Sequence, residues 1–138
     1  DFELITCPPL LKTREGEQAI NVTDISIIKI DVEGAESEVM ESMKGTITRL
    51  RPFIICEILP VYRKENVFRK ERQEKIEGML KGLDYTIFRV ITSSSGRFVS
   101  IEEVKEIGVH SDMHLCEYFF TPDELKPAFI DKIKSSNV

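Results

Sequence analysis

The densest apolar run of the chain covers residues 25–30 and reads Ile-Ser-Ile-Ile-Lys-Ile. Its residues are mostly β-branched and do not alternate strictly with polar ones, which is typical of a strand buried on both faces. Residues 53–58, Phe-Ile-Ile-Cys-Glu-Ile, repeat this pattern. We therefore predict two central strands of an α/β sheet.

Helical spacing follows each of these strands. Apolar residues recur every three or four positions over residues 35–50 and again over residues 67–83, which predicts two helices that each bury one stripe. Gly45 is expected to end or bend the first helix. A strand, a helix and a second strand make a βαβ unit with a right-handed crossover, so we predict a mostly parallel sheet.

The rest of the chain predicts two further strands, at residues 85–91 and 114–120, and a final helix. The Ser-Ser-Ser-Gly turn at residues 93–96 is expected to start a hairpin. Ser100 and Glu103 have the spacing of a capping box, which predicts a short helix after this turn.

The chain has the length of one domain. Its 138 residues, 41% of them hydrophobic, can form one core, with residues 1–24 as an irregular lead-in and residues 25–138 as the α/β part. Because the sequence begins with Asp1 rather than methionine, we expect a piece of a longer polypeptide. No apolar run approaches the roughly 20 residues of a membrane span, and no membrane partner is expected.

Charge and cysteine content narrow the class of partner. The net charge is −5, and the basic residues are scattered apart from the pairs Arg63-Lys64 and Arg69-Lys70, which argues against a nucleic-acid partner. Three cysteines without a Cys-x-x-Cys spacing suit reduced thiols, so a cytoplasmic location is expected. A small or weakly charged substrate fits this composition.

Carboxylates gather where the two predicted central strands end. Asp31 directly follows the first strand, Glu33 and Glu36 lie in the turn and helix start after it, and Glu57 lies near the end of the second strand. Open α/β sheets bind ligands at this carboxyl edge. The simpler alternative is that Glu33 and Glu36 only complement the helix dipole.

Lys29 and the two histidines have their own interpretations. Lys29 interrupts the apolar strand, and we expect it to pair with Glu57 or Glu33 rather than to act in catalysis. The histidines flank an aspartate within residues 110–114 and form either a metal pair or, as we expect, part of a solvent-exposed loop.

Four blocks of the sequence form a longer pattern. Residues 29–36 read Lys-Ile-Asp-Val-Glu-Gly-Ala-Glu, followed by Val-Met at 39–40, Lys-Gly at 44–45 and Arg-Pro-Phe-Ile-Ile-Cys-Glu at 51–57. The order and spacing of these blocks resemble the FkbM family of S-adenosylmethionine-dependent methyltransferases. The resemblance is strong over residues 26–58, and beyond them only the order of elements agrees.

This resemblance implies a partial Rossmann-like methyltransferase sheet, mostly parallel, with an antiparallel last strand and helices on both faces. It also implies methyl transfer from S-adenosylmethionine, to an oxygen atom of a small-molecule or glycan acceptor. The glycine-rich turn and the ribose-binding acid of such enzymes are not found in residues 1–24. We therefore expect the carboxy-terminal half of a methyltransferase, inactive alone and binding the cofactor weakly or not at all.

Within this resemblance the acids receive roles. Asp31 is the first candidate for the substrate-facing or base role, and Glu57 is the second catalytic candidate. Glu33 and Glu57 are expected to orient the acceptor, or to help hold a divalent cation if the acceptor is a diol; no resident metal is predicted. Asp31, Val32 and Glu33 are expected to contact the cofactor, and the loop at residues 61–66 the acceptor.

Two other functions stay open. One is a non-catalytic α/β module for association or for holding a substrate. The other is a Mg²⁺-dependent hydrolase using Asp31, Glu33 and Glu57, which lacks a convincing nucleophile or phosphate loop. In either case the strand at residues 25–30 is expected to expose an edge, covered by a second copy in a homodimer or by residues 4–7.

Overall fold

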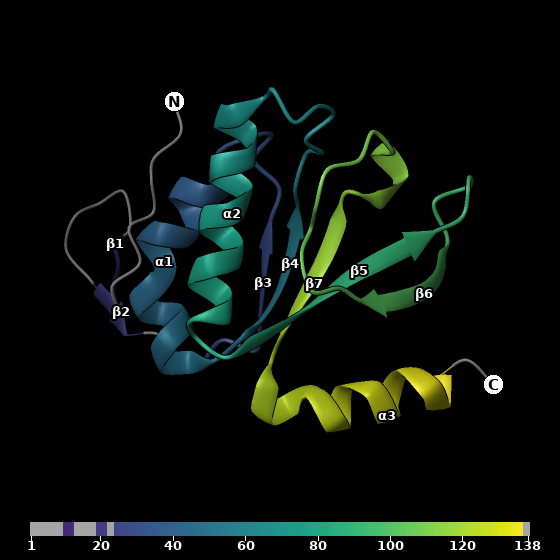
Figure 1. Ribbon diagram of the computed structural model, residues 1–138. Helices are drawn as coiled ribbons and strands as arrows, with labels where there is room; N and C mark the ends of the chain where they lie inside the picture. The colour runs from purple at the N-terminus through teal and green to yellow at the C-terminus, as the bar shows by residue number, and fades with distance from the viewer. Residues whose placement is uncertain (1–9, 13–18, 22–23, 137–138) are drawn as a thin grey trace.

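The computed structural model describes residues 10–12, 19–21 and 24–136 (Figure 1). Its centre is a five-stranded sheet, and no helix of the described part is long and apolar enough to cross a membrane. In chain order the elements are β1 (Leu10–Lys12), β2 (Ala19–Asn21), β3 (Ile27–Ile30), α1 (Glu36–Leu50), β4 (Phe53–Glu57), α2 (Val67–Lys81), β5 (Tyr85–Thr92), β6 (Phe98–Glu103), η1 (Met113–Leu115), β7 (Glu117–Pro122), η2 (Asp123–Leu125) and α3 (Lys126–Ser136), η1 and η2 being 3-10 helices.

The sheet has the strand order β3-β4-β7-β5-β6, and β1 and β2 form a separate antiparallel pair. β3 and β4 are parallel, whereas the other three pairings of the sheet are antiparallel. The prediction of a mostly parallel sheet is therefore wrong. The reason is that β7 inserts between β4 and β5, and that the tight turn after β5 sends β6 back along it. The predicted antiparallel last strand and the predicted hairpin are confirmed.

Two local predictions were also wrong. The capping box does not form, because Ser100 lies opposite Ile91 and Glu103 opposite Phe88 in the β5–β6 ladder. This ladder pairs the backbone of the whole segment, whereas a cap satisfies only one or two amide groups. In addition, α1 continues through Gly45 to its last residue, Leu50.

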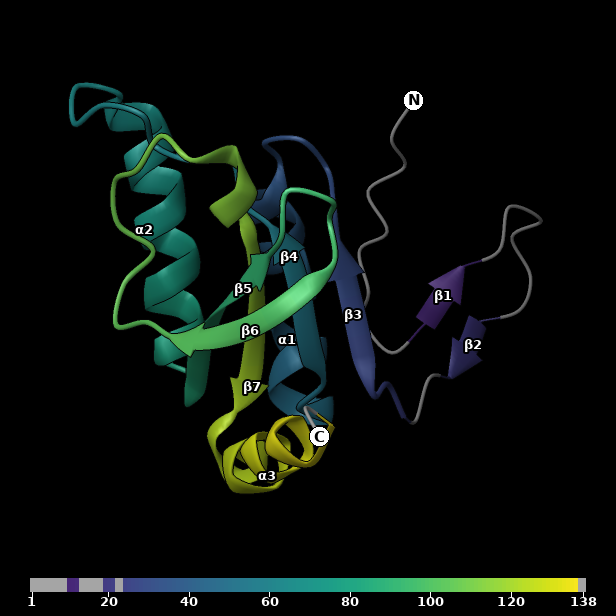
Figure 2. The same ribbon diagram turned by 90° about the vertical axis from the view of Figure 1, so that its right-hand side faces the viewer.

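Helices cover both faces of the sheet, as predicted. α1 and α2 bury one face, where Ile54, Cys56 and Phe120 belong to the hydrophobic core. α3 covers the other face, where Phe129 stacks on Phe119 with 4.7 Å between ring centroids. Figures 1 and 2 show these two layers, with α3 crossing the sheet at one end.

β3 is half-buried, so the prediction of a strand covered on both faces is wrong. Ile28 and Ile30 point into the core, whereas Ile27 is 53% exposed and Lys29 faces solvent. The aromatic contacts of α3 reach β4, β5 and β7 on that side. β3 is also an edge strand in the described part of the chain. Residues 4–7 lie outside the described residues, so the expected cover of this edge stays a prediction.

Candidate functional site

The parallel pairing of β3 and β4 brings Asp31 and Glu57 together. Ile30 lies opposite Cys56, and the two acids are the next residues of their strands, at the same edge of the sheet. Glu117, the first residue of β7, lies directly opposite Glu57. Three carboxylates from three adjacent chain segments therefore meet at this edge, which we call the acidic rim.

The acidic rim changes the protonation of Glu57. Burial raises the pKa of Glu57, and the negative charges of Asp31 and Glu117 and a hydrogen bond with Asp31 raise it further. The positive charge of Lys29 acts in the opposite direction. A carboxyl group with a raised pKa is a better proton acceptor in its ionised form, which suits general-base chemistry.

Lys29 lies at the same rim but not as predicted. Its side chain is 66% exposed, and its Nζ lies 3.2 Å from Oδ2 of Asp31. The expectation of a buried lysine paired with Glu57 or Glu33 is therefore wrong. Because the face of β3 that carries Lys29 is uncovered, the lysine has no desolvation cost that a buried partner must offset.

The turn after β3 is held by Glu36. Glu33 and Gly34 both have positive φ angles, of 49° and 111°, so the chain reverses sharply before α1. Oε1 of Glu36 accepts a hydrogen bond from the Gly34 amide at 2.6 Å, and Glu36 is only 5% exposed. Glu33 is exposed and precedes the helix, whereas Val32 packs against the hydrophobic core. Of the two acids in the helix-dipole alternative, only Glu36 thus lies in the first turn of α1.

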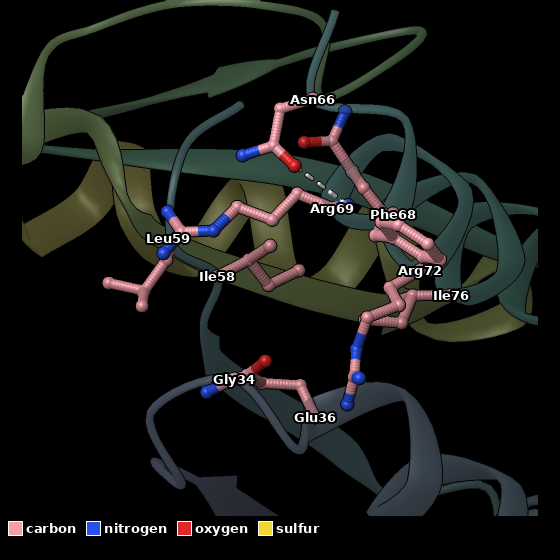
Figure 3. Close-up of a pocket in the computed structure, with 10 residues that line it drawn as sticks. Gly34, Glu36, Ile58, Leu59, Asn66, Phe68, Arg69, Arg72 and Ile76 are labelled. Atoms are coloured by element: carbon pink, nitrogen blue, oxygen red, sulfur yellow. Dashed lines mark hydrogen bonds between the residues drawn. The ribbon is translucent and has the colours of Figure 1, made fainter. Parts of the chain in front are cut away.

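A pocket of about 330 Å³ lies between this turn and the start of α2 (Figure 3). Gly34 and Glu36 form one side, Ile58 and Leu59 after β4 form the floor, and the first two turns of α2 form the other side. The same turn of chain therefore carries Asp31 toward the acidic rim and Glu36 toward the pocket.

Hydrogen bonds fix the α2 side of the pocket. Asn66 caps α2, its Oδ1 accepting from the Arg69 amide, and the Arg69 guanidinium donates to the carbonyl of Pro60 at 3.3 Å. Arg72 forms an ion pair with Glu38 of α1. In Figure 3 the Arg72 side chain extends across the pocket toward the turn that carries Glu36.

Gln73 contributes an unpartnered acceptor. Its side chain is 4% exposed and lines the pocket, and its Nε2 donates to the carbonyl of Gly108 at 2.9 Å. Its Oε1 is buried without a hydrogen-bond partner. Since a buried acceptor without a donor costs free energy, a ligand hydroxyl or amide would be favoured there.

Sequence reasoning reached only part of this pocket. Asn66 belongs to the loop expected to bind the acceptor, but Phe68, Arg69, Arg72 and Gln73 follow it on α2. Their positions fit the polar, solvent-facing stripe of a helix. One signal was available: an aromatic residue, Phe68, stands on that otherwise polar stripe.

The histidines do not face each other across a metal site. Nε2 of His110 lies 3.2 Å from the Tyr118 hydroxyl, whereas His114 belongs to η1. Burial, and then the charge of Arg89, lower the pKa of His110. Within residues 24–135, whose side chains are described, no three His, Cys, Asp or Glu side chains are placed to hold a metal ion.

The family model of the methyltransferase FkbM domain matches residues 14–87, more than half of the 138 residues. The chain belongs to the FkbM methyltransferase family. The matched part of this FkbM domain contains Asp31, Glu57 and every residue that lines the pocket. No curated protein and no solved structure matches the chain.

The FkbM family implies S-adenosylmethionine as cofactor, and the described residues fit it only in part. The acidic rim is suited to a sulfonium cation, because its carboxylates place negative charge beside β3. The adenosine would need a glycine-rich turn and an acid on strands beyond β3. β3 is the edge strand in the described part of the FkbM domain, so these residues alone do not form the cofactor site.

Proposed function

We propose that this FkbM domain transfers a methyl group from S-adenosylmethionine to an oxygen atom of a small-molecule or glycan acceptor. The observation that carries the proposal is the pairing of Asp31 with Glu57, whose pKa is raised, at the carboxyl edge of a family-typical β3-α1-β4 unit. In this proposal the chain supplies the acceptor side of the active site, and strands beyond β3 hold the cofactor.

Glu57 is the proposed base. Attack by a hydroxyl oxygen requires loss of its proton, and an ionised carboxylate within hydrogen-bond distance accepts that proton. Burial and the charge of Asp31 increase the proton affinity of Glu57. Asp31, held by Lys29, orients the acceptor and maintains the negative potential at the acidic rim.

The pocket beside the turn is the proposed place for the body of the acceptor. Its volume of about 330 Å³ suits one ring or a short chain. Gln73 Oε1 and the buried Glu36 carboxylate are both acceptors, which favours a molecule that carries hydroxyl groups. Ile58 and Leu59 offer an apolar surface to its ring or chain.

The proposed location is the cytoplasm. Cys56 and Cys116 are buried free thiols, and burial raises the pKa of Cys116 to about 11. Thiols of this kind persist without oxidation in a reducing compartment.

The alternative function is a non-catalytic association module, favoured by the open edge of β3. Calorimetric titration with S-adenosylhomocysteine separates the two. We expect saturable binding to the natural protein that contains this domain, and weak or no binding to residues 1–138 alone. Absence of binding to the natural protein would reject the methyltransferase proposal and favour the module.

A further inference from the structure

Exposed apolar side chains gather at one end of α2. Nine large hydrophobic residues are exposed among the described residues, and five of them lie at this end, which we call the apolar lip. Phe68 is the most exposed of all, at 82%. The members of the apolar lip are Tyr62, Val67, Phe68, Val109 and Met113.

Contacts make the apolar lip one continuous surface. The Tyr62 hydroxyl lies 2.9 Å from Sδ of Met113, and Val109 is bridged to the neighbour of Tyr62 in the chain. The Arg69 guanidinium lies over the Tyr62 ring, 5.6 Å from its centroid, while Arg69 and Phe68 line the same pocket. The lip therefore runs from the loop before α2 to the mouth of the pocket.

Basic residues surround the apolar lip. Residues 61–72 hold five lysines and arginines but only two glutamates, whereas the whole chain carries a net charge of −5. Arg63 and Lys64 are exposed and make no ion pair with any described residue. The basic pairs that look scattered in the sequence are thus collected by the fold around Phe68.

We propose that the apolar lip docks on an anionic lipid surface, with Phe68 and Val67 at the headgroup boundary and Arg63 and Lys64 against the headgroups. Peripheral proteins bind membranes through this combination of exposed apolar residues and neighbouring basic ones. The proposal concerns contact with the surface and replaces the expectation that no membrane takes part. It does not depend on the proposed methyl transfer.

The composition of the apolar lip favours lipid over single-stranded nucleic acid. Nucleic-acid grooves combine basic residues with several aromatic platforms on which bases stack. Here Val67, Val109 and Met113 outnumber the aromatic residues, and the Tyr62 ring is covered on one side by Arg69. Flexible aliphatic side chains suit acyl chains better than base stacking.

Vesicle sedimentation tests the proposal. We expect the chain to sediment with vesicles rich in phosphatidylserine and not with pure phosphatidylcholine vesicles, and to dissociate at high salt. Phe68→Ala should weaken binding by about tenfold, and the double change Arg63→Glu with Lys64→Glu by more than tenfold, since each basic residue near the surface contributes about fivefold.

The β5–β6 hairpin offers matched controls. Phe98 is 47% exposed and Arg97 is exposed, and they lie at the β6 edge of the sheet, away from the lip. Phe98→Ala and Arg97→Glu should leave vesicle binding unchanged. The proposal is overturned if the chain ignores phosphatidylserine vesicles, if the control changes weaken binding equally, or if single-stranded RNA binds in preference to the vesicles. It is also overturned if Phe68→Ala dissolves a dimer while vesicle binding is absent.

Discussion

The turn between β3 and α1 depends on a single glycine. Gly34 has a φ angle of 111°, a conformation that residues with a side chain rarely adopt, although a methyl group at this position would meet no atom within 4 Å. Its amide also donates to Glu36. The cost of a substitution is therefore conformational and not steric.

Gly34→Ala is expected to lower the free energy of unfolding by about 1–2 kcal/mol, because alanine is strained at positive φ. Gly45→Ala is the matched control, since Gly45 is helical and equally open. This control should raise the free energy of unfolding by up to about 1 kcal/mol. Urea denaturation measures both, and equal effects in the same direction would contradict this explanation of the turn.

At the level of elements, Arg51 joins three parts of the fold. It ends α1 in a left-handed conformation with a φ angle of 53°. Its guanidinium donates to both carboxylate oxygens of Glu124, at 2.8 and 2.7 Å, and to the carbonyls of Leu83 and Asp84. These bonds offset the strain of a non-glycine residue in this conformation and tie α1 to the α2–β5 turn and to η2.

This ion pair predicts a pH dependence. The hydrogen bonds with Arg51 lower the pKa of Glu124 to about 2 from an ordinary value of 4.5. The stabilisation is therefore complete above pH 4.5 and is lost as the pH falls toward 2. Because the Glu124 side chain is 51% exposed, it contributes only about 1 kcal/mol or less.

Glu124→Gln should thus lower the free energy of unfolding by up to about 1 kcal/mol at pH 7, and the difference from the native chain should shrink toward pH 2. Urea unfolding at several pH values measures this. Glu106→Gln is the control, because Glu106 is exposed and makes no ion pair with the described residues. A difference that is constant with pH would contradict the assignment to Arg51.

Sequence patterns predicted the elements better than their neighbours. Periodicity located α1, α2 and the central strands, because burial of one stripe is a local property of the sequence. It could not reveal that Tyr118 and Phe120 of β7 enter beside β4, since strand order depends on contacts far apart in the chain. The apolar run at β3 indicated two covered faces, yet Ile27 is exposed, because burial depends on what packs against the strand.

The candidate site was predicted to the same extent. Adjacent parallel strands must place Asp31 and Glu57 at one edge, so their proximity follows from the sequence. Glu36 and Gln73 could not be ranked in this way, because their burial results from the packing of α1 against α2. The family motif identified the rim, and the fold supplied the pocket.

At the scale of the whole molecule, the open edge of β3 predicts association. The edge exposes unpaired backbone groups beside Ile27, which favours pairing with a second copy of the chain. Light scattering of residues 1–138 should show a homodimer, and Ile27→Lys should shift it toward monomer. Val99→Lys, on the exposed face of β6, serves as control. A native chain that is monomeric at every concentration would contradict this prediction.

The central claim is that Glu57 accepts the proton of the acceptor hydroxyl during methyl transfer. The most direct test is the pH dependence of methyl transfer by the natural protein, compared with Glu57→Gln and, as control, with the exposed rim residue Glu33→Gln. The base must be ionised, so the native rate should rise with pH through the raised pKa of Glu57. Glu57→Gln should lose that rise and about 10²–10⁴-fold in rate, whereas Glu33→Gln should keep both. An unchanged rate and pH profile in Glu57→Gln would contradict the account.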